Sequence, residues 1–483
     1  MKKRNIYFSL FIVFVFITFG CSKNDTPDDL TNYDLTLSKQ INQFIVEVVE
    51  EIYLWESETD WYKYNNKIAF ANYTDHYKLF SELKYKDDHW SMLTDDIEGL
   101  REQFDGINTT FGYSLSLYKL ISGNIIGVIL YTSPGSPAEK AGLKRGDVIV
   151  EMNSKAITES NYLELYYASS LDIRCGIFSV MSKTYQTLPE TISLRAVNMY
   201  EDPINTYTII EKEGHKIGYL CLMGYQMESE KELVRIFTDF KSGGVTDVVL
   251  DLRYNPGGYA RTAQFLCSIL APESVVKNKN VYLEHKYNDL LTNEIKSSGD
   301  DLVEYFIDTL SVNMNLSRLY VLTSKKTASA SEATMVGLEP YLDLIQVGEV
   351  TSGKYCGGML ISPENKYGSN NKNYYAKFSN WGMYIMIYRF FNIKGISSFT
   401  SGLVPEIYAE EDDFNLKPFG DEADPLLGRA LAHILNKEYV ESRAGKILLP
   451  VTQLPDIKRV TDGLMIYQPS SLPIFSSPGN ISE

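Results

Sequence analysis

Hydrophobic and polar residues follow three different patterns along the chain, and each pattern covers its own stretch. From Ile41 to Ile52 apolar residues recur three or four positions apart, which predicts a helix with one apolar face. The aromatic run from Tyr53 to Trp61 follows, and we expect it to pack as a small helical cap. Residues 36–103 are therefore expected to form a helical N-terminal region.

Residues 104–200 change to strand patterns separated by glycine turns. A strand starts after the turn at Phe111-Gly112-Tyr113, and residues 125–131 form a second β-rich run. The segment 136–153 (SPAEKAGLKRGDVIVEMN) combines a short helix, which has a proline in its first turn and a glycine at its end, with a tight turn and another strand. We expect a β-rich domain here.

Residues 205–437 alternate between apolar strand runs and helical spacing. The runs predict strands at 217–222, 245–252, 319–323 and 344–349, and the spacing predicts a helix at 228–240. Strands that alternate with helices indicate an α/β core with a mixed, largely parallel sheet. We expect residues 275–300 and 308–313 to be loops around this core. The proline-containing stretch 438–483 is expected to wrap the core or to be partly disordered.

Residues 1–20 have the pattern of an export signal, with a basic start and then an apolar run. The run ends at Gly20-Cys21 in a loose bacterial lipobox. We expect Cys21 to be lipidated and residues 21–35 to tether the protein to a lipid bilayer; a cleaved, unlipidated signal peptide is the alternative. The protein is therefore expected in the bacterial cell envelope, facing the periplasm or the cell exterior.

Length, charge and cysteines narrow the function classes. The 483 residues suffice for two or three domains, and the formal net charge of −16 argues against a nucleic-acid partner, because no net positive field would attract phosphates. Neither a zinc-like cysteine spacing nor an HExxH motif is present in the sequence. We expect no metal and no cofactor.

Two short motifs carry the strongest chemical signal. Residues 327–332 (TASASE) place serines at the expected start of a helix, and Gly353-Lys354 follows beyond one helix and one strand. Serine is a poor nucleophile at neutral pH unless a base assists it. None of the five histidines has a recognisable triad context, so Lys354 is the most economical base for a Ser-Lys dyad. Ser329 and Ser331 point to different sides of a helix, so only one of them can face Lys354.

Residues 251–258 (DLRYNPGG) add a strand end followed by a glycine turn. Such a turn exposes backbone N–H groups that can face an oxyanion. The N–H of Ala330 and the dipole of the expected helix also favour negative charge near Ser329. Because an α/β sheet gathers its loops at one edge, these segments are expected to meet there.

The segment 136–153 resembles the helix-turn-strand block of a PDZ domain. The DLRYNPGG, TASASE and SGK motifs, in this order, resemble the C-terminal processing peptidases, also called tail-specific proteases, and the resemblance covers most of residues 36–437. It implies an α/β catalytic core with a mixed sheet, preceded by a PDZ-like β-rich domain and a small helical N-terminal segment. The expected order is signal peptide 1–20, lipoprotein tether 21–35, helical region 36–103, PDZ-like domain 104–200, α/β peptidase domain 205–437 and C-terminal extension 438–483.

The resemblance also implies roles for single residues. The family's serine-to-lysine spacing makes Ser329, rather than Ser331, the nucleophile and Lys354 the general base. Many family members have a glutamine where this chain has Gly358, and some have an aspartate at Pro340, beside which Glu339 could substitute. These departures put the strength of the activity in question.

An oxyanion hole would be formed by the amide of Ala330 and by one glycine, either Gly257 or Gly258. The PDZ-like domain would hold the free C-terminus of a polypeptide by β-augmentation, with the carboxylate at the loop Phe111-Gly112-Tyr113; a PDZ-like fold used only as a spacer is the alternative. Burial must lower the pKa of the catalytic lysine for it to act as a base, whereas a carboxylate partner such as Glu349 would raise that pKa.

We therefore expect a serine endopeptidase that cleaves flexible or unfolded polypeptides, recognised by their C-termini, through an acyl-enzyme. The alternative is a catalytically weak or inactive PDZ lipoprotein that binds peptides. An esterase ranks behind both, because the chain lacks a GxSxG nucleophile motif.

Overall fold

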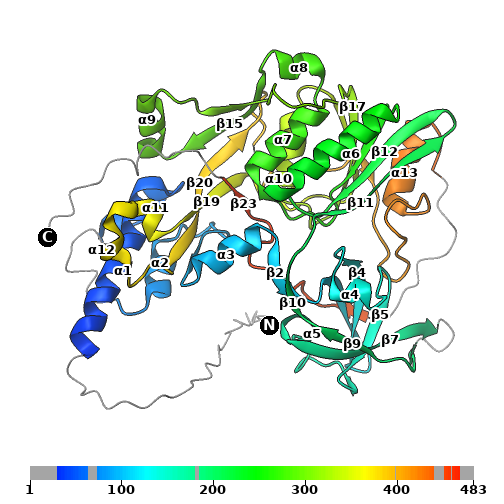
Figure 1. The fold of residues 1–483 in the computed structure, drawn as a ribbon, viewed down its shortest axis with the longest axis horizontal. Helices are drawn as coiled ribbons and strands as arrows, with labels where there is room; N and C mark the ends of the chain where they lie inside the picture. The colour runs from blue at the N-terminus through cyan, green and yellow to red at the C-terminus, as the bar shows by residue number, and fades with distance from the viewer. Residues whose placement is uncertain are drawn as a thin grey trace, which may run out of the picture.

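The computed structural model describes residues 30–63, 73–179, 184–397, 399–439, 451–457 and 459–467 (Figure 1). The predicted signal peptide, Cys21 and the first part of the tether lie outside these residues. No helix within the described ranges is long and apolar enough to cross a membrane.

The N-terminal region is helical, as the apolar spacing predicts. Its helices are α1 (Leu30–Ile52), α2 (His76–Leu83) and α3 (Ile97–Phe104), and two short 3-10 turns cover Glu56–Glu58 and Trp61–Lys63. The apolar face of α1 is buried from Ile41 to Ile52 and belongs to the large core of the α/β part of the molecule. The small N-terminal segment is therefore packed onto the rest of the fold, as Figure 1 shows on the side of α11 and α12.

A β-rich domain follows, as expected, built on one antiparallel sheet with its own core. Its strands are β3 (Tyr113–Leu120), β4 (Ile125–Thr132), β5 (Val148–Met152), β6 (Lys155–Ala156), β7 (Ser170–Ser179), β8 (Thr184–Thr187) and β9 (Ile192–Arg195), with helices α4 (Pro137–Lys140) and α5 (Glu164–Tyr167). The strand order is β22-β3-β4-β5-β7-β8, where β22 (Val451–Gln453) comes from the C-terminal part of the chain. An antiparallel pair of strands, β2 (Ile107–Thr110) and β10 (Val197–Tyr200), joins the chain that enters this domain to the chain that leaves it.

The central layer is a six-stranded sheet in the order β11-β12-β13-β17-β18-β21, parallel except for β11. The strands are β11 (Ile204–Lys212), β12 (His215–Leu222), β13 (Asp247–Asp251), β17 (Arg318–Thr323), β18 (Asp343–Gly348) and β21 (Ile407–Tyr408). Helices α6 (Glu230–Ser242), α7 (Ala260–Leu270) and α10 (Ala330–Leu338) lie on one face, and α13 (Pro425–Ile434) on the other (Figure 1). Alternate residues of each strand face opposite sides, so Val248 joins one core and Val249 the other.

A second sheet, which the sequence patterns do not predict, completes the α/β part. It runs β14-β23-β19-β20-β15-β16, with β1 on β20. Its strands are β1 (Met92–Thr94), β14 (Gly258–Tyr259), β15 (Val281–Tyr287), β16 (Val303–Tyr305), β19 (Cys356–Ile361), β20 (Gly382–Phe391) and β23 (Met465–Ile466), and the helices α11 (Pro363–Tyr367) and α12 (Lys372–Tyr375) flank it.

The expectation of loops at 275–300 is wrong. This stretch forms α8 (Glu273–Lys277), β15 and α9 (Asp289–Ser298). In β15 buried residues alternate with the exposed Glu284 and Lys286, so the strand is half polar and resembles a surface segment when it is read without its partners. The expected loop at 308–313 is confirmed.

Candidate active site

Ser329 lies directly before α10 in a strained backbone conformation. Its φ is +64° and its ψ is −112°, a region that non-glycine residues rarely adopt and that costs about 1–3 kcal/mol. The side chain is completely buried, and its Oγ has no hydrogen-bond partner among the described residues. Strain and an unpaired buried hydroxyl both cost stability, so this turn is shaped for something other than stability.

A buried carboxylate connects Ser329 to Lys354. Glu332, in the first turn of α10, accepts the backbone N–H of Ser329 (2.8 Å) and that of Lys354 (2.9 Å) on the same oxygen, Oε2. Its other oxygen accepts the Thr351 hydroxyl and the Gly353 N–H, at 2.5 and 2.6 Å. One side chain therefore fixes the serine turn and the lysine loop to each other, although a helix and a strand separate them in sequence.

The Lys354 side chain is buried in an aromatic cage. Its Nζ lies 3.3 Å from the Tyr384 hydroxyl, and 5.5 and 5.7 Å from the ring centres of Tyr384 and Trp90. No carboxylate of the described ranges lies within ion-pair distance of this Nζ. Glu349, the carboxylate that would raise the pKa of Lys354 if it paired with it, pairs with the exposed Lys325 at 2.9 Å instead.

This setting shifts the pKa of Lys354 downward, to about 8. The main cause is burial, which disfavours the charged ammonium; electrostatic interactions with Cys356, Asp88 and Glu332 act in the opposite direction and are weaker. At pH 7 about one lysine in ten is then neutral, against roughly one in three thousand for an ordinary lysine. The residue has the properties that a general base requires.

Tyr384 occupies the space of the missing glutamine. A Cβ placed on Gly358 would lie 2.6 Å from Cζ of Tyr384 and 2.5 Å from Cε of Met386, so no larger side chain fits there. The Tyr384 hydroxyl donates to the backbone oxygen of Met465 (2.6 Å) and accepts from Lys354. Because its proton is committed to Met465, the tyrosine takes one N–H of the lysine and leaves the lone pair of a neutral amine free.

The other serine of the motif faces elsewhere. Ser331 Oγ donates to the backbone oxygen of Asn255 at 3.1 Å and so supports the glycine turn. No hydrogen bond joins Ser329 Oγ directly to Lys354 Nζ in this conformation. Glu339, which the sequence offered as a substitute acid, pairs with Lys394 at 2.9 Å.

The glycine turn lies against Ser329. A Cβ on Gly257 would be 2.8 Å from the Ser329 Cβ, whereas a Cβ on Gly258 would meet the backbone of Tyr225. The N–H of Gly257 donates to Asn255 Oδ1 (2.9 Å), and that of Gly258 donates to the Leu464 oxygen (3.1 Å).

Ala330, the third oxyanion candidate, differs from the two glycines. It is the first residue of α10, so its N–H has no partner within the helix. None of the described residues accepts a hydrogen bond from it.

A buried ion cluster holds this turn. Arg253 is fully buried and contacts Asp251 (Nε to Oδ1, 2.9 Å), Glu411 (2.6 Å) and Asp424 (2.7 Å). Asn255 Nδ2 donates to the Leu222 oxygen at 3.1 Å. These contacts give Arg253, Asn255 and Asp251 a structural role in shaping the turn, and none of the three is needed for proton transfer.

Two family profiles match parts of the chain. Residues 216–409 match the profile of peptidase family S41, and residues 128–168 match that of a PDZ domain. The chain carries an S41 peptidase domain. The S41 match covers the strands from β12 to β21, the serine turn and the lysine loop, and the PDZ match precedes it.

Similar proteins bear related names. The probable CtpA-like serine protease of Staphylococcus aureus (strain MRSA252) is 27% identical over 330 residues, which are 63% of this chain and 62% of that protein. The carboxyl-terminal-processing protease of Picosynechococcus sp. is 27% identical over 235 residues, or 48% of this chain and 51% of that protein. The chain thus matches less than two thirds of the length of these relatives. A crystal structure of an S41 protein from Bacteroides fragilis has the same fold, with a TM-score of 0.66 at 24% identity; the match covers 81% of this chain and 97% of that one.

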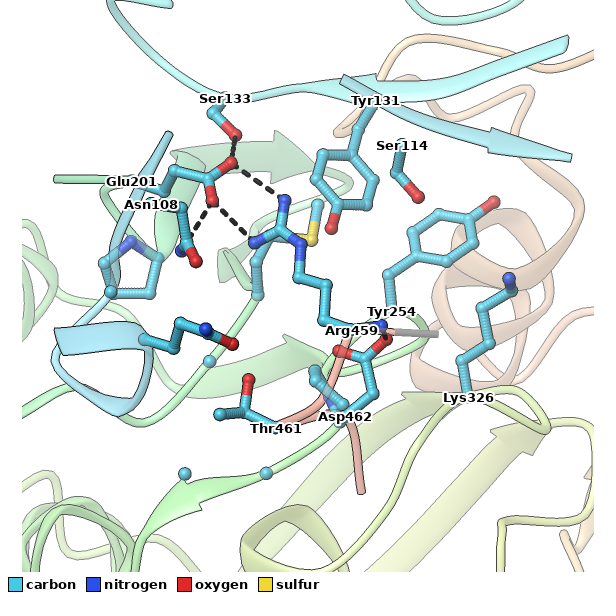
Figure 2. A pocket seen from close by; sticks show the side chains of 18 of the residues that line it. Asn108, Ser114, Tyr131, Ser133, Glu201, Tyr254, Lys326, Arg459, Thr461 and Asp462 are labelled. Carbon is cyan, nitrogen blue, oxygen red and sulfur yellow. Dashed lines mark hydrogen bonds and ion pairs between the residues drawn. The ribbon is translucent and has the colours of Figure 1, made fainter. Parts of the chain in front are cut away.

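A cavity of about 370 Å³ separates the S41 domain from the PDZ domain. Gly257, Gly258 and Ala328 line it on one side, and Tyr113 and Ser114 at the start of β3 line it on the other. Figure 2 shows that the C-terminal residues Arg459, Thr461 and Asp462 also reach into this space. The cavity has the size of a binding site and adjoins the serine turn.

The predicted peptide loop lies on the PDZ side of the molecule. The side chains of Phe111 and Tyr113 are buried in the PDZ core, and Gly112 has a φ of +80°, which glycine adopts without strain. A second cavity, of about 410 Å³, lies beside this loop and is also lined by Leu165 and Tyr166.

Proposed function

We propose that the protein is a serine endopeptidase in which Ser329 is the nucleophile and Lys354 the general base. The observation that carries the proposal is the shared oxygen of Glu332, which accepts from the backbone N–H groups of both residues. This contact supports a dyad because it holds a strained, buried serine and a buried, unpaired lysine on adjoining loops. A lysine placed after a strand by chance would be exposed to solvent.

The chemistry follows from these positions. Neutral Lys354 takes the proton of the Ser329 hydroxyl as the serine oxygen attacks a peptide carbonyl, and the resulting ammonium later protonates the leaving amine. The product is an acyl-enzyme, which water hydrolyses with Lys354 again as the base. The Ser329 side chain has to rotate toward Nζ first, because the two groups are not hydrogen-bonded in the resting conformation.

We assign the oxyanion hole to the N–H groups of Ala330 and Gly257. The amide of Ala330 is unpaired, and Gly257 is the glycine in contact with Ser329. Gly258 is less suitable because its N–H is used in the pairing of β14 with the C-terminal segment. Gly257 has to release Asn255 Oδ1 before it can stabilise an oxyanion, and its lack of a side chain permits that rotation.

The substrates we propose are flexible or unfolded polypeptides with free C-termini. The cavity between the PDZ domain and the S41 domain adjoins the serine turn, and the name of the Picosynechococcus relative refers to carboxyl-terminal processing. We also propose export to the cell envelope with a lipid anchor on Cys21, which rests on the sequence of residues 1–21 alone.

The test is cleavage of an unstructured protein with an apolar C-terminus by residues 22–483 across a range of pH. We expect Ser329→Ala and Lys354→Ala to abolish cleavage, and Ser331→Ala to retain most of it. Loss in Ser331→Ala but not in Ser329→Ala would move the nucleophile to Ser331. Absence of cleavage at every pH, with peptide binding retained, would favour the alternative, an inactive peptide-binding lipoprotein.

A further inference from the structure

The peptide-accepting edge of the PDZ sheet is already occupied by the chain itself. β22 pairs antiparallel with β3, with Val451 opposite Leu120, Thr452 opposite Lys119 and Gln453 opposite Tyr118. The pairing continues with a hydrogen bond of 2.8 Å from the Leu454 N–H to the Leu117 oxygen. β3 is the strand that follows the loop at Phe111-Gly112-Tyr113, so this is the edge at which β-augmentation is expected.

The direction of β22 is that of a bound peptide. It enters at the far end of β3 and runs toward the loop where a C-terminal carboxylate would be held. Leu454 and Ile457 pack against the PDZ core, and Ile457 lines both cavities together with Tyr113 and Tyr166. A substrate tail and residues 451–457 therefore cannot occupy this edge at the same time.

The two ends of the C-terminal segment are held with different strength. β22 has three residues, and the side chains of Thr452 and Gln453 are exposed. β23, in contrast, is inserted between β14 and β19, and both Met465 and Ile466 are buried. The β22 end therefore has far less buried apolar surface to lose on release.

Charged contacts hold the part in between across the cleft. Asp456 pairs with Lys326 at 2.8 Å, next to the serine motif, and Arg459 contacts both oxygens of Glu201, at 2.5 and 3.0 Å. Figure 2 shows the Arg459 guanidinium directed at Glu201, with Ser133 and Asn108 on the same carboxylate. The segment thus crosses the entrance that a polypeptide would use to pass from the PDZ edge to Ser329.

We propose that residues 451–457 are a displaceable internal ligand of the PDZ edge, which the C-terminal tail of a polypeptide substrate must replace before cleavage. This inference rests on the proposed function, but the binding experiment that tests it does not require catalysis. Anchored at β23, the segment remains attached after β22 is displaced, so the competition is intramolecular and reversible.

Two variants change this competition in opposite directions. Lys119→Cys with Thr452→Cys places cysteines on directly opposed residues, whose Cα atoms in an antiparallel pair are about 4.5–5.5 Å apart, within the range of a disulfide. Oxidation would lock β22 in place. Leu454→Pro removes the N–H that donates to Leu117 and weakens the pairing. Thr452→Ala, at an exposed side chain, is the control for Leu454→Pro, and the two single cysteine variants are the controls for the lock.

The first readout is binding, measured in a Ser329→Ala background so that it does not depend on catalysis. The probe is a fluorescent peptide with alanine at a free C-terminus, and its amidated form is the comparison. We expect Leu454→Pro to bind about tenfold more tightly than its parent, the gain for an edge that is free in about one molecule in ten. The oxidised double-cysteine protein should bind at least tenfold more weakly than its reduced form. Equal binding in all forms would overturn the proposal, because the peptide would then not compete with β22; no binding in any form would also overturn it, because β22 would then be a permanent strand of the sheet.

The second readout is cleavage by the same variants with Ser329 restored. The oxidised lock should slow cleavage of an unstructured protein and leave cleavage of a short peptide substrate, which does not reach the PDZ edge, unchanged. Equal cleavage of the long substrate by the locked and reduced forms would contradict the inference. An enzyme that cleaves neither substrate, but shows the expected binding changes, would refute the proposed peptidase and leave the internal ligand established.

Discussion

The burial of Lys354 predicts that the protein gains stability when this lysine is removed. A lysine whose pKa falls from 10.5 to about 8 on folding has lost roughly 2.5 pKa units, which correspond to about 3 kcal/mol of unfavourable free energy whenever the group is charged in both states. Lys354→Met replaces the ammonium with an apolar side chain of similar length. The variant loses the hydrogen bond to Tyr384, worth about 1 kcal/mol, so we expect a net gain of about 2 kcal/mol at pH 7.

The pH dependence of this gain tests its cause. Below pH 8 the folded and unfolded chains both carry the charge, and the parent bears the whole burial cost. Between pH 8 and 10.5 the unfolded chain binds more protons than the folded one, so the stability of the parent rises with pH across this window and the advantage of the variant shrinks.

The assay is urea unfolding of the parent and Lys354→Met at several values from pH 7 to pH 10. Lys325→Met is the control, because Lys325 is exposed and forms a surface ion pair with Glu349; its effect should stay within about 0.5 kcal/mol at every pH. A Lys354→Met protein that is less stable than its parent at pH 7, or a difference that does not change with pH, would refute the assignment of the low pKa to burial.

Three further outcomes are expected from the same site. The kcat/KM for peptide cleavage should rise with pH through an apparent pKa of about 8, since only neutral Lys354 acts as a base; a midpoint near 10 would mean that the lysine is solvated. Tyr384→Phe should lower kcat roughly 10–100-fold and move that midpoint to lower pH, because the lost oxygen accepts from the ammonium, whereas Tyr388→Phe on the same strand should leave the midpoint unchanged. Glu332→Gln replaces one acceptor oxygen by a donor facing buried N–H groups, and it should destabilise the protein by about 2–4 kcal/mol and reduce activity at least 100-fold, measured by thermal unfolding and by kcat. Wild-type activity in this last variant would show that the shared oxygen does not position the dyad.

The fold could be predicted where the hydrophobic pattern of a segment is sufficient to indicate its type. Four strands of the parallel sheet, such as the fully buried β13, are apolar runs that can be recognised in the sequence, whereas the partly buried β11 and β21 were not predicted. The shortest strands of the second sheet could not be recognised in this way. β14 and β23 have two residues each, and they exist because distant parts of the chain pair with each other.

The same distinction applies to the site. Ser329 and Lys354 are predicted because they occur in motifs, and Glu332 could have been predicted as well, since a serine followed three positions later by glutamate at a helix start is a capping signal. Tyr384 had no such signal. It lies within an unbroken apolar strand, and the only indication was the absence of a side chain at Gly358.

The contact between Tyr384 and Met465 determines when the surroundings of Lys354 are completed during synthesis. The tyrosine that orients Lys354 is itself held by a backbone oxygen located 81 positions further along the chain. Because chains are synthesised and delivered from the N-terminus, the lysine acquires its final setting only after residues 465–466 have emerged and inserted between β14 and β19. In the proposed peptidase, a nascent chain that still lacks residues 465–466 therefore contains the serine and lysine motifs without the assembled base.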